Sequence, residues 1–441
     1  MQRRHPRTTT YPGMTQSAPT ATGSATPVSA ADGTPLKRSL RRALLRSKLR
    51  ALALIAPLLI FILITFIAPI ADMLLRAVEN QIVSNTLPRT VNALADWDHR
   101  NQHLPPETVY AALAQDLQEA VNNKTHTRVG SRLNYEKTGI SSLFRRSGRK
   151  VKRWDLTTGA PVKDRLIGIH PGWADRDNWL TILTFSPHYT GGYFLNAVDL
   201  KLTPGGIEIK KPEQRIYLTL FNRTLAMSLT ITLLCLLIGY PVAYLLATLP
   251  MRTANLLLIL VLLPFWTSLL VRTSAWKVLL QQQGVINDVL VTIGLIGDPE
   301  RLQMINNPFG TIIAMTHILL PFMILPLYAV MKTISPMYVR AAKSLGATPW
   351  TAFRKVYFPQ SVPGIGAGAV LVFILSIGYY ITPEIVGGTT GTFISNRIAY
   401  HISSSLNWGL GAALGALLLV LVLALYIVYD KIVGIDNVKL G

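Results

Sequence analysis

The sequence predicts an all-α polytopic membrane protein with about six transmembrane helices and a large exported insert between the first two. Three observations lead to this class: an apolar excess, repeated segments long enough to cross a bilayer, and the positions of lysine and arginine beside them. Half of the 441 residues are hydrophobic and 15% are charged, with a mean hydropathy of +0.35. That composition is unusual for a soluble protein of this length.

Several apolar segments have the roughly 20 residues that a membrane-spanning helix needs. They cover residues 51–71, 225–249, 254–271, 310–330, 364–381 and 410–429. Proline and glycine interrupt several of them, which bundled membrane helices tolerate because neighbouring groups satisfy the freed backbone. The first segment has no small-residue cleavage pattern close behind it, so we expect an uncleaved first helix over 51–76.

Lysine and arginine predict the orientation. They gather before the first span, at Arg252 in the loop between spans two and three, and in the loop between spans four and five. With six spans, all three segments lie on one side, and cytoplasmic loops carry this excess. Both termini are therefore expected in the cytoplasm. The basic insert does not contradict this, because long loops are exempt from the rule.

The expected organisation follows from these spans. It comprises a disordered tail (1–36), a basic juxtamembrane segment (37–50), the first helix (51–76), the insert (77–215), a five-helix core (216–435) and a short cytoplasmic tail (436–441). Within the insert, "PPETVYAALAQDLQEAVNN" has apolar residues at helical spacing. The stretches "NWLTILTF" and "IEIKKPEQRIYLTL" are interpreted as strand-like or irregular. The basic run 145–154 is expected to be a solvated loop or a partner-facing patch.

Metal, disulfide and bond-breaking chemistry are not expected. Cys235 is the only cysteine, so no disulfide framework is available. The histidines show no metal-ligand spacing, and no nucleophile and base pair is apparent. Between spans three and four, an amphipathic segment after Gly284 is too short to span. We expect it to be an interfacial or re-entrant helix at the outer surface.

The segment 333–363, here named the coupling loop, has the pattern of two helices joined by a turn. Its first apolar face comprises Tyr338, Ala341, Ala342 and Leu345. Gly346 suits a helix C-terminus that needs a left-handed residue, and Thr348 with Pro349 suits a helix start. Trp350 and Phe353 lie on the apolar face of the second helix, which Pro359 and Pro363 are expected to end before the next span.

Three explanations compete for this loop. A DNA-binding helix-turn-helix has similar spacing, but the next span begins too soon for its second helix to enter a groove. A passive amphipathic helix on the membrane surface is the structural alternative. The third is a docking element for a cytoplasmic partner.

The coupling loop resembles the "EAA" motif of inner-membrane permease subunits of binding-protein-dependent ABC importers. That motif is Glu-Ala-Ala, three residues, Gly, nine residues, then Ile-x-Leu-Pro. This chain has Ala341-Ala342, Gly346 and "VYFP" ending at Pro359 at the same spacing. It departs at Arg340, which stands where the motif has Glu. The stretches "LLVRTSAWKVLLQQQGVINDVL" and "GYYITPEIVGG" are most similar to spermidine/putrescine-type permeases.

The resemblance implies a transport subunit of a bacterial inner membrane, with no enzymatic activity of its own. It implies several partners: two copies of an ATP-binding subunit, a second permease in a heterodimer, a periplasmic substrate-binding protein and membrane lipid, but no nucleic acid. ATP and Mg²⁺ would bind the ATPase, and no cofactor or metal this chain. Consistently, the sequence contains no G-x-x-x-x-G-K-[ST] phosphate loop. The docking residues would be Ala341, Ala342, Leu345 and Gly346, with Trp350 and Phe353 supporting the turn. Arg340 and Pro359 are the other residues expected to belong to this ATPase-coupling site.

For the substrate path, acidic residues near the membrane are the first candidates because they are expensive to bury there. The acidic candidates are Glu384, Asp72 and Asp288, and the aromatic ones that could stack on a cation are Tyr379, Tyr380 and Trp276. Helix-end acids can equally face water, and the aromatics suit an interfacial belt. The expected substrate is a polyamine. Alternatives are an opine, an aminophosphonate or ferric iron, an ATP-independent secondary transporter or channel, and a receptor or scaffold built on the insert.

Overall fold

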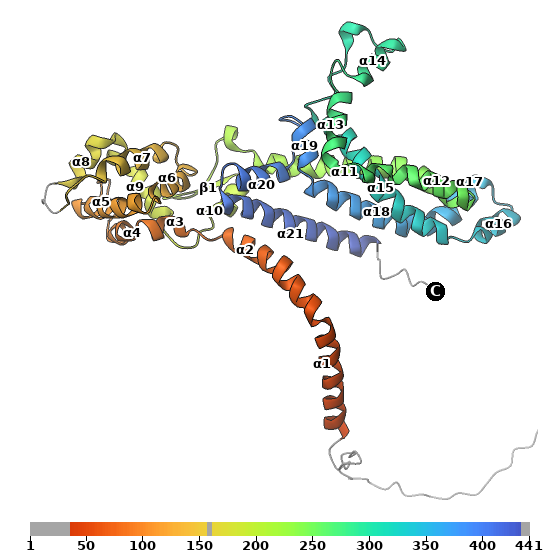
Figure 1. Cartoon of the computed structure of the whole chain (residues 1–441), viewed down its shortest axis with the longest axis horizontal. Coiled ribbons are helices and arrows are strands. Elements are labelled where there is room, and N and C mark those ends of the chain that lie inside the picture. The colour runs from red at the N-terminus through yellow and green to blue at the C-terminus, as the bar shows by residue number, and fades with distance from the viewer. Residues whose placement is uncertain (1–35, 157–160, 434–441) are drawn as a thin grey trace, which may run out of the picture. The chain divides into compact units, whose positions relative to one another are not determined.

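The computed structural model describes residues 36–156 and 161–433 (Figure 1). The tails expected over 1–36 and 436–441 lie outside these residues, apart from Leu36. The chain divides into two units, residues 1–70 and 71–441, and each is described by itself.

The first unit is helical throughout its described part. The helix begins as α1 (Leu36–Ile62), passes through a wider π-helical turn, η1 (Leu63–Ile67), and continues into α2 (Ala68–Arg76). At the π turn, the Thr65 hydroxyl donates a 2.6 Å hydrogen bond to the Phe61 carbonyl. Residues Ser47–Arg76 are long and apolar enough to cross a membrane, as predicted for the first span.

The second unit begins with the insert, residues 77–215. Its elements are α3 (Gln81–Thr86), α4 (Pro88–Ala95), α5 (Glu107–Asn122), α6 (His126–Asn134), α7 (Ile140–Val151), α8 (Val162–Ile169), η2 (Pro171–Ala174), α9 (Arg176–Thr184), α10 (Gly192–Ala197), β1 (Leu200–Thr203), β2 (Gly206–Ile209) and η3 (Pro212–Gln214). The two strands form an antiparallel hairpin with Leu200 opposite Ile209 and Thr203 opposite Gly206. The helix predicted within 105–123 is α5.

Buried aromatic side chains form the centre of the insert. Trp173, Trp179, Tyr110 and Phe144 are all fully buried. The Tyr110 hydroxyl and the Trp179 indole both donate to the Trp173 carbonyl, at 2.8 and 3.0 Å. The Trp173 indole donates to the Ser147 hydroxyl at 2.7 Å. Because each buried polar group has a partner, these rings contribute their apolar area without an unpaired donor.

The interpretation of "NWLTILTF" as strand-like or irregular is wrong, because it lies almost entirely in α9. The Asp175 carboxylate caps this helix by accepting from the Asp177 amide at 3.0 Å. Trp179 and Ile182 lie three residues apart on its buried face. Packing of that face against the aromatic core outweighs the β preference of the threonines and isoleucine. In "IEIKKPEQRIYLTL" the first three residues do lie in β2, whereas the last four begin a long helix.

The core of the second unit follows the insert. Its elements are α11 (Tyr217–Thr248), α12 (Met251–Leu262), η4 (Leu263–Trp266), α13 (Leu269–Leu279), α14 (Val285–Thr292), η5 (Asp298–Glu300), α15 (Pro308–Thr333), α16 (Pro336–Ser344), α17 (Pro349–Ala352), η6 (Phe353–Tyr357), α18 (Phe358–Gly378), α19 (Ile381–Val386), α20 (Ile394–Ser403) and α21 (Trp408–Val433). The amphipathic segment predicted after Gly284 is α14. Its Val285 and Val289 side chains are each 51% exposed.

Three long helices, α11, α15 and α18, pack side by side and form the buried centre of the core (Figure 1). Met323 of α15 lies where they meet. A Cβ added to Gly368 of α18 would stand 2.7 Å from the Met323 sulfur, and one added to Gly239 of α11 would stand 3.1 Å from its Cγ. Small residues at such contacts let membrane helices approach closely. Van der Waals packing between the closely spaced helices then stabilises the bundle.

The third predicted span, 254–271, is broken in the structure. Helices α12 and α13 form a pair bent by 94°, and η4, Thr267 and Ser268 separate them. Pro264 cannot continue the hydrogen-bond ladder, and the Ser268 hydroxyl starts a new helix by accepting from the Val271 amide at 3.2 Å. Among the described residues, five helices can each cross a membrane, and six crossings result if the bent pair counts as one.

Asp199 ties the insert to the core. Its buried carboxylate accepts from the backbone amides of Ile216, Tyr217 and Leu218 at 2.9–3.1 Å, where α11 begins. A carboxylate at this position satisfies amides that have no partner within the helix and interacts favourably with the helix dipole. Tyr193 and Ala197 of the insert then pack with Leu410 and Ala413 of α21.

His401 of α20 lies buried in the same region. Its ring nitrogens face the hydroxyls of Tyr217 and Ser405, each at 3.0 Å. Burial, with Arg397 and Lys210 nearby, lowers the pKa of His401 from 6.5 to about 4. The unfolded chain therefore takes up this proton first, and the folded state loses stability as pH falls from 6.5 towards 4, by up to roughly 3 kcal/mol.

We therefore expect the melting temperature of the detergent-solubilised chain to fall when the pH is lowered from about 7.5 to about 5. His401→Gln removes the titrating group, so its melting temperature should change much less over that range. An equal drop in both proteins would contradict this assignment. His188 is exposed, and His188→Gln is the matched control.

Candidate functional site

The first helix of the coupling loop, α16, has defined ends. At its start, the Ser335 hydroxyl accepts from the Met337 amide at 3.4 Å, and Pro336 occupies the first helical position. At its end, the Gly346 amide donates to the Lys343 carbonyl and the Ala347 amide to the Ala342 carbonyl, both at 3.0 Å. This is the Schellman arrangement. Gly346 has a φ of +88°, as the sequence predicted.

The second helix begins as predicted but does not end as predicted. The Thr348 hydroxyl accepts from the Thr351 amide at 3.2 Å, with Pro349 at the first helical position. From there the chain remains helical to Gly378, so the expectation that Pro359 and Pro363 end this helix is wrong. The π turn η6 precedes Pro359, and its wider ring bonds the Phe358 amide to the Phe353 carbonyl. Widening at this point leaves room for a proline, which supplies no amide hydrogen.

The tip of the coupling loop exposes large apolar side chains. Leu345 is 89% exposed, Met337 72% and Trp350 68%. Ala341 lies beside them and is also exposed, whereas Ala342 is half-buried. A cluster of exposed apolar residues on a rigid turn is typical of an interaction surface. Arg340 is exposed on the same helix, and no acidic side chain of the described residues forms an ion pair with it.

Aromatic packing fixes the second helix of the loop against α11. Phe353 stacks between Trp350 and Tyr357, at ring distances of 5.8 and 5.9 Å. It also meets Tyr240 and Tyr244 of α11 edge-on, at 6.2 and 6.0 Å. Phe353 therefore packs the second helix of the loop against a membrane helix. The partners on α11 have no signal in the sequence, because they lie more than a hundred positions upstream.

The substrate-path candidates after span five lie close together. Asn396 of α20 donates to the Tyr380 carbonyl at 2.9 Å and to the Glu384 carboxylate at 2.6 Å. Ser395 donates to the Tyr379 carbonyl at 2.6 Å. Glu384 itself is exposed and has no basic partner among the described residues. Sequence reasoning missed Asn396, which holds this group together.

The remaining candidates lie elsewhere and have partners. Trp276 of α13 donates to the His317 ring of α15 at 3.1 Å. Asp288 forms a 2.7 Å ion pair with Arg301, and Asp72 a 2.8 Å ion pair with Arg76. The structure thus leaves Glu384 as the one predicted acid without an ion-pair partner in the described ranges 36–156 and 161–433. No group of three metal-binding side chains occurs in those ranges.

Comparison with known proteins identifies the class. Residues 236–433 match the family described as "Binding-protein-dependent transport system inner membrane component". The spermidine/putrescine transport system permease protein PotB of Haemophilus influenzae is 37% identical over 223 residues, which cover 49% of this chain and 77% of that protein. The Escherichia coli PotB is 32% identical over 266 residues, 59% of this chain and 96% of that protein.

A solved bacterial ABC transporter that imports the acidic polysaccharide alginate is also similar, with 23% identity and a TM-score of 0.39 over 49% of this chain and 79% of that one. At that score the likeness adds nothing to the assignment. The sequence relatives decide it: the chain belongs to the family of inner-membrane permeases of binding-protein-dependent ABC importers. Within that family it is close to permeases of the polyamine type.

The geometry of the turn makes a prediction about Gly346. A Cβ there would meet nothing within 4 Å, so any substitution acts through the backbone conformation alone. Gly346→Val should strain the turn by about 1 kcal/mol or more, whereas Asn tolerates a positive φ. We expect amide hydrogen exchange over 336–348 to be several-fold faster in Gly346→Val than in Gly346→Asn. Equal exchange in the two variants would show that the turn does not depend on this conformation.

Proposed function

We propose that this permease carries a polyamine across the inner membrane and that its coupling loop docks on a separate ATP-binding subunit. The proposed assembly holds two ATP-binding subunits, a second permease and a periplasmic substrate-binding protein. ATP and Mg²⁺ bind the ATPase and no cofactor binds this chain. The relatives named for spermidine and putrescine support the substrate class, and the family description supports the binding protein.

The observation that carries the docking proposal is the exposed apolar tip of the coupling loop. Leu345 is 89% exposed and Trp350 68%. Fully burying one such side chain contributes about 1.5–3 kcal/mol, so the pair can supply a useful part of a docking energy. Because the loop continues as one helix into α18, a partner that pulls on it would move a helix of the membrane core directly.

The orientation belongs to the same proposal. Lys332, Lys343, Arg354 and Lys355 lie in or beside the coupling loop, as the positive-inside rule expects for a cytoplasmic segment. The two termini are then cytoplasmic, and the insert is periplasmic. In that arrangement Glu384, at the opposite end of α18 from the loop, faces the side from which substrate arrives.

The docking proposal is tested by Leu345→Asp. Because this side chain is almost free of intramolecular contacts, the substitution should leave the melting temperature unchanged and remove most of the co-purifying ATPase. Ala342→Glu, in the last turn of α16, should also remove most of the co-purifying ATPase. Ile207→Asp is the matched control, since Ile207 is 62% exposed on the β hairpin of the insert. If the ATPase still co-purifies with both loop variants and ATP-driven uptake survives, the docking role is wrong.

The substrate proposal is tested at Glu384. Its carboxylate is exposed, and its neighbour Tyr380 is 47% exposed, so both can meet a cation. In the reconstituted importer, Glu384→Gln should raise the KM for spermidine about tenfold, as the loss of one charge-assisted contact would. Basal ATP hydrolysis should be unchanged.

Asp288→Asn is the control for this change, because Asp288 is an acid that already forms an ion pair, with Arg301. If the KM stays constant in Glu384→Gln, or rises equally in Asp288→Asn, Glu384 does not contact the cationic substrate. ATP-dependent uptake of an opine, an aminophosphonate or ferric iron, without polyamine uptake, would replace the substrate class while leaving the docking proposal intact.

A further inference from the structure

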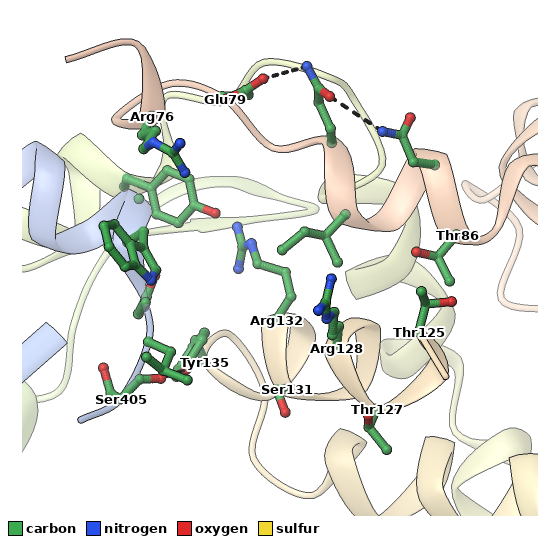
Figure 2. A pocket seen from close by; sticks show the side chains of 18 of the residues that line it. Arg76, Glu79, Thr86, Thr125, Thr127, Arg128, Ser131, Arg132, Tyr135 and Ser405 are labelled. Atoms are coloured by element: carbon green, nitrogen blue, oxygen red, sulfur yellow. Dashed lines mark hydrogen bonds between the residues drawn. The ribbon is translucent and has the colours of Figure 1, made fainter. Parts of the chain in front are cut away.

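A cavity of about 890 Å³ opens within the second unit, between the insert and the core. Helices α3 and α6 of the insert form one side of it, and the end of α2 with the start of α21 forms another. Figure 2 shows the side chains of Arg76, Arg128 and Arg132 turned towards its interior. Hydroxyl groups of Thr86, Thr125, Thr127, Ser131 and Ser405 are also part of the lining. The transport mechanism proposed above uses none of these residues.

Arg132 is the central observation. Its side chain is only 3% exposed, yet one of its three guanidinium nitrogens lacks a partner. Nε donates to Asn80 at 2.9 Å and Nη1 to Glu136 at 2.7 Å, while Nη2 has no hydrogen-bond acceptor among the residues that the structure describes. The Tyr193 ring lies 4.6 Å from the guanidinium carbon and fixes its plane. A buried charged donor left unpaired costs free energy, so this nitrogen marks where an acceptor is missing.

The other charges of the lining favour an anion. Arg128 is exposed and has no acidic partner among the described residues, and Arg76 pairs with Asp72. Glu79 is the one acid that lines the cavity, and it accepts a hydrogen bond from Gln81 at the far side from Arg128. Two acids behind the lining also contribute: the charges of Arg132 and Arg76 are balanced by their ion-pair partners, Glu136 and Asp72. Arg128 and the free edge of Arg132 therefore supply the unsatisfied donors.

From this geometry we infer that the cavity binds a phosphate-type oxyanion, held by the Nη2 of Arg132 and by Arg128. Arginine suits this role because its planar fork presents several donors to one oxyanion. Thr86, Thr125 and Ser405, which also line the cavity, carry further hydroxyl groups. The ligand bridges the insert to the membrane core, because Arg128 and Arg132 belong to α6 and Ser405 precedes α21.

Two sources can supply this chemistry. Arg76 ends one predicted span and Trp408 begins another, and the Arg76 guanidinium lies 5.6 Å from the Trp408 ring. Arginine and tryptophan at span ends are typical of the membrane–water interface, where lipid headgroups lie. The anion is therefore either the phosphodiester of an anionic lipid or a soluble phosphate from the aqueous side.

The experiment uses the full chain, purified in detergent without phosphate. Phosphatidylglycerol, phosphatidylcholine or inorganic phosphate is titrated in separate arms, and binding is followed by thermal shift and, for lipids, by native mass spectrometry. Arg128→Gln is the main variant, because this exposed residue can change without unfolding the helix. We expect it to weaken binding about tenfold, as the loss of one charge-assisted hydrogen bond would. Arg132→Lys, which keeps the charge and loses the fork, should weaken binding as well.

Arg149→Gln is the matched control, with the same charge change on the exposed face of α7. Binding of phosphatidylglycerol alone, sensitive to Arg128→Gln, would assign the site to a lipid headgroup. Binding of inorganic phosphate with the same sensitivity would assign it to a soluble anion. The inference is overturned if neither probe binds, or if Arg149→Gln weakens binding as much as Arg128→Gln. These outcomes are independent of ATPase docking and of polyamine transport.

Discussion

The structure depends on one constraint: a bilayer provides no water to satisfy a backbone amide or carbonyl, so the chain must remain helical wherever it crosses. The helix from Pro349 to Gly378 obeys this constraint although two further prolines, Pro359 and Pro363, follow the one that begins it. The π turn at Phe353–Tyr357 absorbs the disruption just before Pro359. As a result, the second helix of the coupling loop is continuous with a membrane span and forms its first part.

Packing then converts this helix into part of a rigid centre. Gly368 lets α18 approach Met323 of α15, while Phe353 packs edge-on against two tyrosines of α11. The bend in the core also lies at a defined position in the sequence. Pro264 and the Ser268 cap break the α12–α13 pair by 94°, and the Thr273 hydroxyl lies 3.1 Å from that of Thr382 in α19. The bent pair is thereby connected to the short helix that carries Glu384.

The insert is joined to this core by polar groups that are buried at its base. Asp199 caps α11 with three backbone contacts, and the His401 ring lies 3.0 Å from the Tyr217 hydroxyl. The cavity lined by Arg132 opens in the same region. The contact between the insert and the core therefore contains both buried hydrogen bonds and an unfilled cavity. The E. coli relative is matched over 96% of its length by 59% of this chain, so much of this chain has no counterpart in that relative.

The sequence by itself determined what depends on local composition. Runs of apolar residues predicted the spans, the Gly346 turn and Thr348 cap were predicted from their residue types, and the motif spacing indicated the family. These features are local because a cap, a positive φ or an apolar run involves only a few neighbouring residues. Tertiary structure decided the rest. It made α9 helical against an aromatic core, carried a helix through Pro359, and brought Asn396 to Glu384 and Arg132 to Ser405. Those outcomes depend on side chains far apart in the chain, whose contacts no local pattern encodes.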